Sequence, residues 1–164
     1  MKRNRVISAA AVICLVAGLL TGCGAVAAGD NGQIRNLAPL SSLKSEFPGY
    51  VDGVINVSGT ACGGGGGPCL NLNTNSFVVI TFDQTYRLDR LTLFVGCEDR
   101  ETMDGEVWNL TDGEKVSLAS FQSKGCGDAI SWPETSANRI SIVMTAGGGT
   151  DNNISVEEIE IYGK

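Results

Sequence analysis

The sequence predicts an all-β protein built as an antiparallel β-sandwich, and two observations carry that prediction. No stretch after the first 22 residues keeps the 3.6-residue apolar period of an amphipathic helix. Short alternating runs rich in Val, Ile, Thr and Phe recur instead between clusters of Gly, Asn and Asp, as strands do between turns. Antiparallel strands with one apolar face bury that face by packing as two sheets, so a sandwich is the expected architecture.

The N-terminal segment has the pattern of an export signal. Three basic residues lie within the first five positions, and an apolar run follows from Val6 to Leu20. This run is shorter than the roughly 20 residues that cross a bilayer as a helix. It ends in Leu20-Thr21-Gly22-Cys23, which resembles the lipobox of bacterial lipoproteins. The resemblance implies cleavage after Gly22, a lipid on Cys23, and an exported protein anchored to a bacterial membrane in the cell envelope.

The rest of the chain divides into a tether and one domain. Residues 23–32 are small or polar and show no periodicity, which is typical of a flexible linker. Residues 33–164 number about 130, enough for a single domain with a core of ordinary size. We therefore expect a signal peptide at 1–22, a lipidated tether at 23–32 and a β-sandwich domain at 33–164.

Charge and composition argue against two classes of function. Removal of the signal leaves 9 Lys and Arg against 18 Asp and Glu, a formal net charge of −9. Such a chain repels phosphate backbones, so no nucleic acid partner is expected. The sequence contains no histidine, which removes the commonest general base and metal ligand. An enzyme would need a carboxylate pair such as Asp99 with Asp128, whose spacing is not distinctive, so we expect no catalytic activity.

Four cysteines remain once those of the signal and the lipidation site are set aside: Cys62, Cys69, Cys97 and Cys126. An even number in an exported protein predicts two disulfides, with three possible connectivities. The short glycine-rich loop favours the pair Cys62–Cys69. The pair Cys97–Cys126 would then join two segments that each follow a strand. A four-cysteine zinc site is the alternative, but the paired C-x2-C spacing of such sites is absent.

Period-two patterns predict six strands. A hairpin should join the third and fourth through Thr111-Asp112-Gly113-Glu114, because Asp-Gly readily adopts the positive φ of a tight hairpin turn. The glycine runs at 63–67 and 147–149 are expected to be loops. The predicted strands are Phe77–Phe82, Arg90–Val95, Glu106–Leu110, Lys115–Phe121, Arg139–Thr145 and Ile154–Tyr162.

The last strand departs from strict alternation. Ile154, Val156 and Glu158 share one face by period two, yet the next apolar residues are Ile159 and Ile161. A β-bulge explains such a slip of phase, which we expect between Glu158 and Ile159. Glu158 then points inward with Val156, and a buried carboxylate needs a cation or several hydrogen-bond donors.

Several segments, taken in order, resemble the discoidin family (coagulation factor type C domains) and the similar galactose-binding-like carbohydrate-binding modules. The resemblance implies an all-β, discoidin-like jelly roll whose loops at one end bind glycans, other proteins or lipid headgroups. The matching segments are Asn36-Leu37-Ala38, Ser41-Ser42, Tyr50-Val51-Asp52-Gly53, residues 77–82, residues 86–94 and residues 155–163.

Many members of that family hold a structural calcium ion, and the resemblance assigns its ligands here to Asp52 and Glu158. Hard cations prefer several carboxylate and carbonyl oxygens. The family's usual Thr-x-Trp after the Val-Asp-Gly step is missing, and Asn56, Ser58 and Thr60 stand in that region instead. The alternative for Glu158 is an inward carboxylate bonded only to backbone amides.

A ligand site is expected where the proposed Cys97–Cys126 disulfide brings two loops together. Sugar sites combine an aromatic ring with planar polar groups. The predicted ligand-binding residues are Asp99 and Arg100 in the first loop and Asp128 and Trp132 in the second. Proline restricts the residue before it to extended geometry, so Trp132 is expected at a strand end, where it either stands exposed to a ligand or packs over the rim of the sandwich.

Trp108 alternates in phase with Leu110, so we expect it in the core. The preferred function is a membrane-anchored, non-catalytic binding module for carbohydrate. The alternative is a protein-interaction or structural lipoprotein of the envelope that binds no glycan.

Overall fold

The computed structural model describes residues 32–53, 69–97, 101–148 and 152–164. The predicted signal, the lipidation site at Cys23 and most of the tether therefore lie outside the described residues. No helix among the described ranges is long and apolar enough to cross a membrane. The elements are β1 (Arg35–Asn36), η1 (Ala38–Leu40), α1 (Leu43–Glu46), η2 (Pro48–Tyr50), β2 (Cys69–Asn71), β3 (Phe77–Val95), β4 (Met103–Asn109), η3 (Thr111–Gly113), β5 (Val116–Ser123), β6 (Asp128–Gly147) and β7 (Asn153–Gly163).

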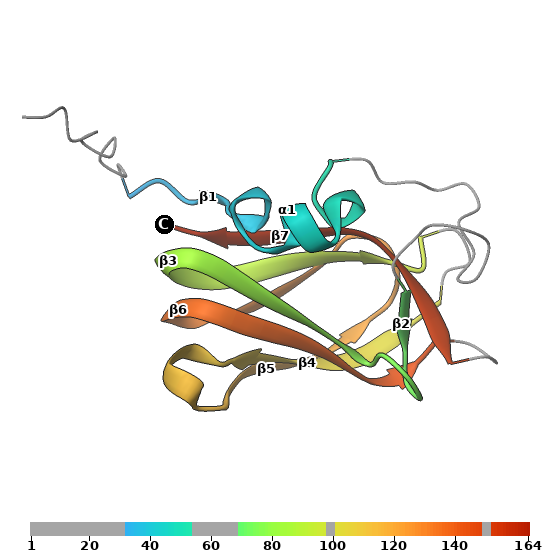
Figure 1. Cartoon of the computed structure of the whole chain (residues 1–164). Helices are drawn as coiled ribbons and strands as arrows, with labels where there is room; N and C mark the ends of the chain where they lie inside the picture. Colours follow the sequence, from blue (N-terminus) through green and yellow to red (C-terminus); the bar gives the residue numbers. More distant parts are fainter. Residues whose placement is uncertain (1–31, 54–68, 98–100, 149–151) are drawn as a thin grey trace, which may run out of the picture.

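The strands form one continuous antiparallel sheet that folds over to give the two layers of a sandwich. The strand order is β1-β7-β3-β6-β4-β5, and β2 pairs with β7. In one layer, the second half of β3 pairs with β7 and with the start of β6. In the other layer, the first half of β3 pairs with the end of β6, which pairs in turn with β4, and β4 pairs with β5. Two long strands thus belong to both layers (Figure 1). The predicted all-β sandwich is confirmed.

The bends in the long β3–β6 pair explain where the predicted strand boundaries were wrong. Register shifts separate Thr81 from Tyr86 and Leu88 from Arg90, but the strand continues through both. The sequence divided β3 into two strands because the first bend falls in its polar stretch. It also missed the first half of β6, because Pro133 cannot donate to a ladder. Pro133 lies opposite the second irregularity, where no ladder partner is required of it.

The predicted hairpin between β4 and β5 is confirmed. The two strands pair antiparallel from Met103 with Ser123 to Asn109 with Val116. Asp112 and Gly113 both have positive φ, at 60° and 80°, which is the backbone geometry of a tight turn that matches strand twist. Asp-Gly therefore determines the turn, as the sequence predicted.

Apolar side chains from both layers fill the space between them, and the short helical segments close its β7 side (Figure 1). In α1, Leu43 is fully buried, and the backbone of Ser42 donates to Thr81 of β3. The largest fully buried side chains are Leu37, Leu43, Ile80, Leu88, Leu91, Leu93, Met103, Ile140, Ile142, Ile154, Ile159 and Ile161.

The last strand contains the predicted bulge. Phe94 pairs with Glu158 and Val95 with Val156, so Glu157 is the extra residue on β7. The slip is therefore one residue earlier than expected. The bulge lets both Val156 and Ile159 point into the core, and it buries Glu157 and Glu158 side by side.

Candidate functional site

A disulfide joins the end of β3 to the turn between β5 and β6. Cys97 and Cys126 are bonded, with their Cα atoms 4.6 Å apart, which confirms this predicted pair. Cys69 is disulfide-bonded as well, while its expected partner Cys62 lies outside the described residues. The Cys97–Cys126 disulfide links the turn of residues 124–127 to the end of β3. The predicted ligand-binding residue Asp128 directly follows this turn.

Hydrogen bonds to the Asp128 carboxylate fix the shape of that turn. Its Oδ2 accepts from the Ser123 hydroxyl at 3.1 Å and from the backbone N–H of Lys124. The Ser123 hydroxyl is fully buried and also lies within bonding distance of the Gly125 carbonyl, at 3.1 Å. A carboxylate that accepts from the residues before it stabilises a tight turn in the same way as a helix cap. Asp128 therefore has a structural role whether or not it also binds a ligand.

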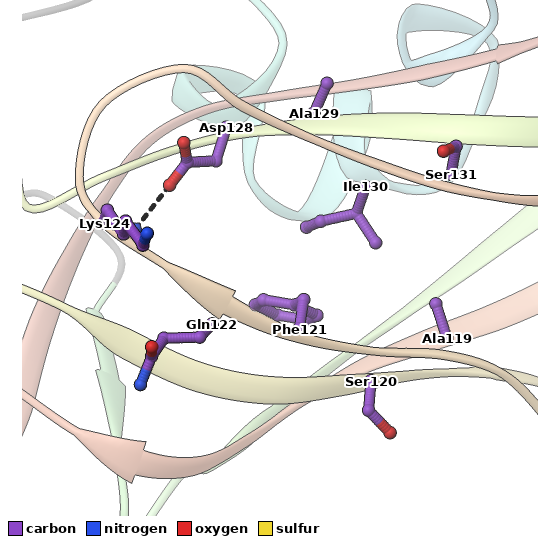
Figure 2. Close-up of a pocket in the computed structure, with 9 residues that line it drawn as sticks. All are labelled: Ala119, Ser120, Phe121, Gln122, Lys124, Asp128, Ala129, Ile130 and Ser131. Carbon is purple, nitrogen blue, oxygen red and sulfur yellow. Dashed lines mark hydrogen bonds between the residues drawn. The ribbon is translucent and has the colours of Figure 1, made fainter.

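The turn forms one end of a hollow of about 420 Å³ at the open edge of the sandwich, between β5 and the start of β6. This volume lies within the range of small-molecule sites. Phe121 and Ile130 point toward each other across it, and Lys124 and Asp128 lie at the turn end (Figure 2). The remaining lining residues are Ala119, Ser120, Gln122, Ala129 and Ser131.

The two large apolar residues of the hollow, Phe121 and Ile130, were not predicted as part of a site. Phe121 was assigned only to a strand, and Ile130 lay in a segment expected to be a loop. The alternation of Ile130 and Trp132 around Ser131 is the signal that would have identified a strand there. Lys124 takes part in neither of the two ion pairs among the described residues, which join Glu134 to Arg87 and to Lys164.

The expectation for Trp132 is wrong. Its side chain is only 6% exposed and belongs to the core, and its indole N–H donates to the Leu88 carbonyl at 3.1 Å. Trp132 does take the extended conformation that a following proline requires, but inside β6, where it points between the layers. A buried indole needs a hydrogen-bond acceptor, and the irregular register of β3 at Leu88 leaves that carbonyl available.

The expectation for Trp108 is wrong in the opposite sense. Met103, Gly105 and Val107 are the buried positions of β4, so Trp108 lies on the outer face and is half-buried. The phase was misjudged because Gly105 marks the inner face without an apolar side chain. A Cβ there would lie 2.5 Å from the Phe121 ring, so the aromatic residue of β5 occupies the space that Gly105 leaves.

The remaining predicted ligand-binding residues, Asp99 and Arg100, lie outside the described residues. They follow Cys97 in the chain, and Cys97 is bonded to the turn that forms the end of the hollow. Their part in a site remains a prediction from the sequence.

The two residues that the family resemblance assigned to calcium lie close together. Glu158 is only 4% exposed, and its Oε2 accepts from the backbone N–H of Gly53 at 3.1 Å. Burial raises the pKa of Glu158 to about 7; the neighbouring charge of Asp52 adds to this rise, and the bond from Gly53 opposes it. A bound cation would favour the charged form of both carboxylates.

These residues fit part of a calcium site. Carboxylate oxygens suit a hard cation, which takes six to eight oxygen ligands. Within the described ranges, however, no group of three or more His, Cys, Asp or Glu side chains converges on one point. Asp52 and Glu158 would therefore supply two ligands, and carbonyl, amide, hydroxyl or water oxygens would have to supply the others. Asn56, Ser58 and Thr60 lie outside the described residues.

No protein-family model and no curated protein sequence matches this chain. Solved structures match its fold at low identity. A family 89 glycoside hydrolase from Clostridium perfringens, in complex with 2-acetamido-1,2-dideoxynojirmycin, matches with a TM-score of 0.55 and 15% identity over 80% of this chain. The chain spans only 14% of the length of that hydrolase.

Two isolated modules match over most of their own length. The family 32 carbohydrate-binding module of NanJ from C. perfringens, in complex with galactose, has a TM-score of 0.54 and 13% identity over 70% of this chain and 82% of its own. The family 32 module of AlyQ, in complex with 4,5-unsaturated mannuronic acid, has a TM-score of 0.52 and 14% identity over 69% of this chain and 82% of its own. At these identities the likeness establishes the fold alone, the discoidin-like β-sandwich of carbohydrate-binding modules.

Proposed function

We propose that this protein is a non-catalytic carbohydrate-binding module that a lipid on Cys23 anchors to a membrane of the bacterial cell envelope. The observation that carries the binding proposal is the hollow at the open edge of the sandwich. There, apolar Phe121 and Ile130 lie beside a cation, Lys124, and a carboxylate, Asp128. Sugars present an apolar C–H face and a fringe of hydroxyls, and these residue types match both.

The fold supports the same proposal. The two isolated modules that match this chain over 82% of their own length are both bound to sugars, one to galactose and one to an unsaturated mannuronic acid. Asp99 and Arg100, which follow Cys97 in the chain, would add planar polar groups. The absence of histidine from the chain leaves hydroxyl recognition to carboxylate, amide, lysine and arginine groups.

A glycan array with purified protein tests the proposal, with Lys124→Ala as the test variant. A lysine that donates to a sugar hydroxyl contributes about 1.5–3 kcal/mol, so the variant should lose at least about tenfold in affinity. Lys44→Ala, which removes an exposed lysine from α1, is the matched control and should bind like wild type. A blank array from folded protein would refute carbohydrate binding and favour the protein-interaction alternative.

Membrane anchoring has a separate test. Mass spectrometry of the protein extracted from bacterial membranes should find the mature N-terminus at Cys23 carrying acyl chains. Cys23→Ser should release the protein from the membrane, because the two or three acyl chains of such lipoproteins anchor stably where a single one does not. An unmodified N-terminus upstream of Cys23 would contradict this part of the proposal.

We also propose that Asp52 and Glu158 hold a structural calcium ion. The ion would link β7, which carries Glu158, to the segment after η2, which carries Asp52. Chelation should lower the melting temperature of the wild-type protein. It should have little effect on Glu158→Gln, which lacks a charged ligand. Glu160→Gln, a change on the same strand, is the control and should respond to the chelator like wild type; equal responses in all three proteins would exclude Glu158 as a ligand.

A further inference from the structure

Trp108 presents an aromatic ring on the outer face of the β3-β6-β4-β5 layer, away from the hollow between the layers. Its neighbours on the adjacent strands are Ser117 on β5 and Ser141 on β6. Both side chains are small. Trp108 is half-buried, so part of its ring is open to solvent and can contact a ligand.

Polar side chains surround this ring. The Glu106 carboxylate, on the same face of β4, accepts from the indole N–H at 3.0 Å. The ammonium of Lys115 lies 4.1 Å from the ring centroid, and the Lys115 side chain is exposed. Arg139 is exposed on β6, two residues from Ser141 and therefore on the same face. An aromatic ring thus has a carboxylate at its edge and a cation over it.

A second aromatic side chain lies on the same face. Phe77 is 54% exposed and pairs with Val143, which in turn pairs with Glu106. Phe77 and Trp108 are therefore two strands apart and offset by two residues. With the usual strand spacing and rise, their Cα atoms are about 12 Å apart. Two rings at that separation span more than one sugar unit.

We propose that this outer face, which we call the Trp108 face and define by Phe77, Glu106, Trp108 and Lys115, binds a glycan chain. A pyranose ring stacks its C–H side on Trp108, and Lys115 moves off the ring to donate to hydroxyls. Glu106 accepts from a hydroxyl, and Phe77 contacts a second sugar unit. The proposal rests on the carbohydrate-binding function, but it names a surface separate from the hollow.

Fluorine NMR can observe Trp108 directly. The protein is labelled with 5-fluorotryptophan, which gives one resonance for Trp108 and one for Trp132, assigned with Trp108→Phe. The probes are soluble β-linked tetrasaccharides of glucose, galactose, N-acetylglucosamine and mannuronic acid, each with its monosaccharide. At least one tetrasaccharide should shift the Trp108 resonance, while the buried Trp132 resonance stays in place as the internal control.

Affinities measured by calorimetry complete the test. Trp108→Ala should lower tetrasaccharide affinity about tenfold, a typical loss when a stacked aromatic ring is removed, and Trp108→Phe should retain most of it. Phe77→Ala should weaken the tetrasaccharide but not the monosaccharide. Leu40→Ala, which truncates a side chain 48% exposed on η1, is the matched control.

The outcomes separate this proposal from the general function. Glycan binding that leaves the Trp108 resonance and the Trp108→Ala affinity unchanged, but is lost in Lys124→Ala, would overturn the Trp108 face and keep the carbohydrate-binding function. No binding of any probe, by either method, would overturn both. A loss in Trp108→Ala with full binding in Lys124→Ala would support the Trp108 face and remove the hollow as the site.

Discussion

The Cys97–Cys126 disulfide allows the most quantitative prediction. Its half-cystines are 29 residues apart, and the closed loop contains both strands of the β4–β5 hairpin. In the chain-entropy treatment, closing a loop of that length removes about 12 cal/mol/K from the unfolded state, or about 3.6 kcal/mol at 25 °C. We expect the double variant Cys97→Ser/Cys126→Ser to lose roughly that much free energy of unfolding.

Urea unfolding of the purified protein measures this loss. With an m-value of about 1–3 kcal/mol/M for a small domain, the midpoint should fall by at least about 1 M. The serine hydroxyls add little cost, because Cys126 is exposed and Cys97 is half-buried. Reduction of the wild type is a poorer test, since it also opens the disulfide of Cys69.

The Cys97→Ala/Cys126→Ala variant separates loss of the cross-link from the effect of new hydroxyls, and it should match the serine variant. A loss below about 1 kcal/mol in both would refute the argument that this cross-link restricts the unfolded chain, given the 3–4 kcal/mol expected for the loop. The Asp128 bonds within the turn would then be sufficient to hold it.

Three further predictions test the packing. Trp132→Ala should cost about 3–5 kcal/mol of stability, as for other large core truncations, while Trp108→Ala should cost clearly less in the same urea titration; equal costs would contradict their burial. Gly105→Ala should destabilise by about 1–3 kcal/mol, because its Cβ would meet the Phe121 ring, and nuclear Overhauser contacts of that ring should change. Glu134 has a lowered pKa through its bonds to two basic partners, so its stabilisation is present above the ordinary carboxyl pKa and is lost as pH falls through the lowered one. The stabilities of wild type and Glu134→Gln should therefore converge on acidification, and a gap that persists would count against the ion pairs.

Local rules predicted the features that depend on neighbours in the chain. Asp112 and Gly113 form their turn because positive φ is accessible to those two residues in any context. The phase slip near Glu158 could be read from the sequence because the apolar residues before Glu158 and those after it follow different phases of the two-residue period. The Cys97–Cys126 pair was favoured among three possible connectivities by the expected export, the number of cysteines and the strands that precede each of them, and the structure confirms it.

The candidate site was predicted less well, because its residues are selected by contacts across the sandwich. Phe121 and Ile130 line the same hollow because β5 and the start of β6 are the edge strands of the two layers on this side of the sandwich. Their sequence patterns are those of ordinary strands. Asp128 was predicted in the right place, at the turn beside the disulfide, but its bonds to the turn backbone could not be inferred from the sequence.

Sequence patterns predicted the all-β chain, the Asp-Gly turn and a bulge near Glu158, and they favoured one of the disulfides, because each depends on local backbone preference, apolar period or cysteine number. The tertiary structure alone decided which tryptophan is buried. Trp132 and Trp108 both lie on extended strands. The pairing of β3 with β6 turns Trp132 into the core, and the pairing of β4 with β6 leaves Trp108 on the outer face. A shift of register by one residue reverses every side chain of a strand, and register is set by partners that are distant in the sequence.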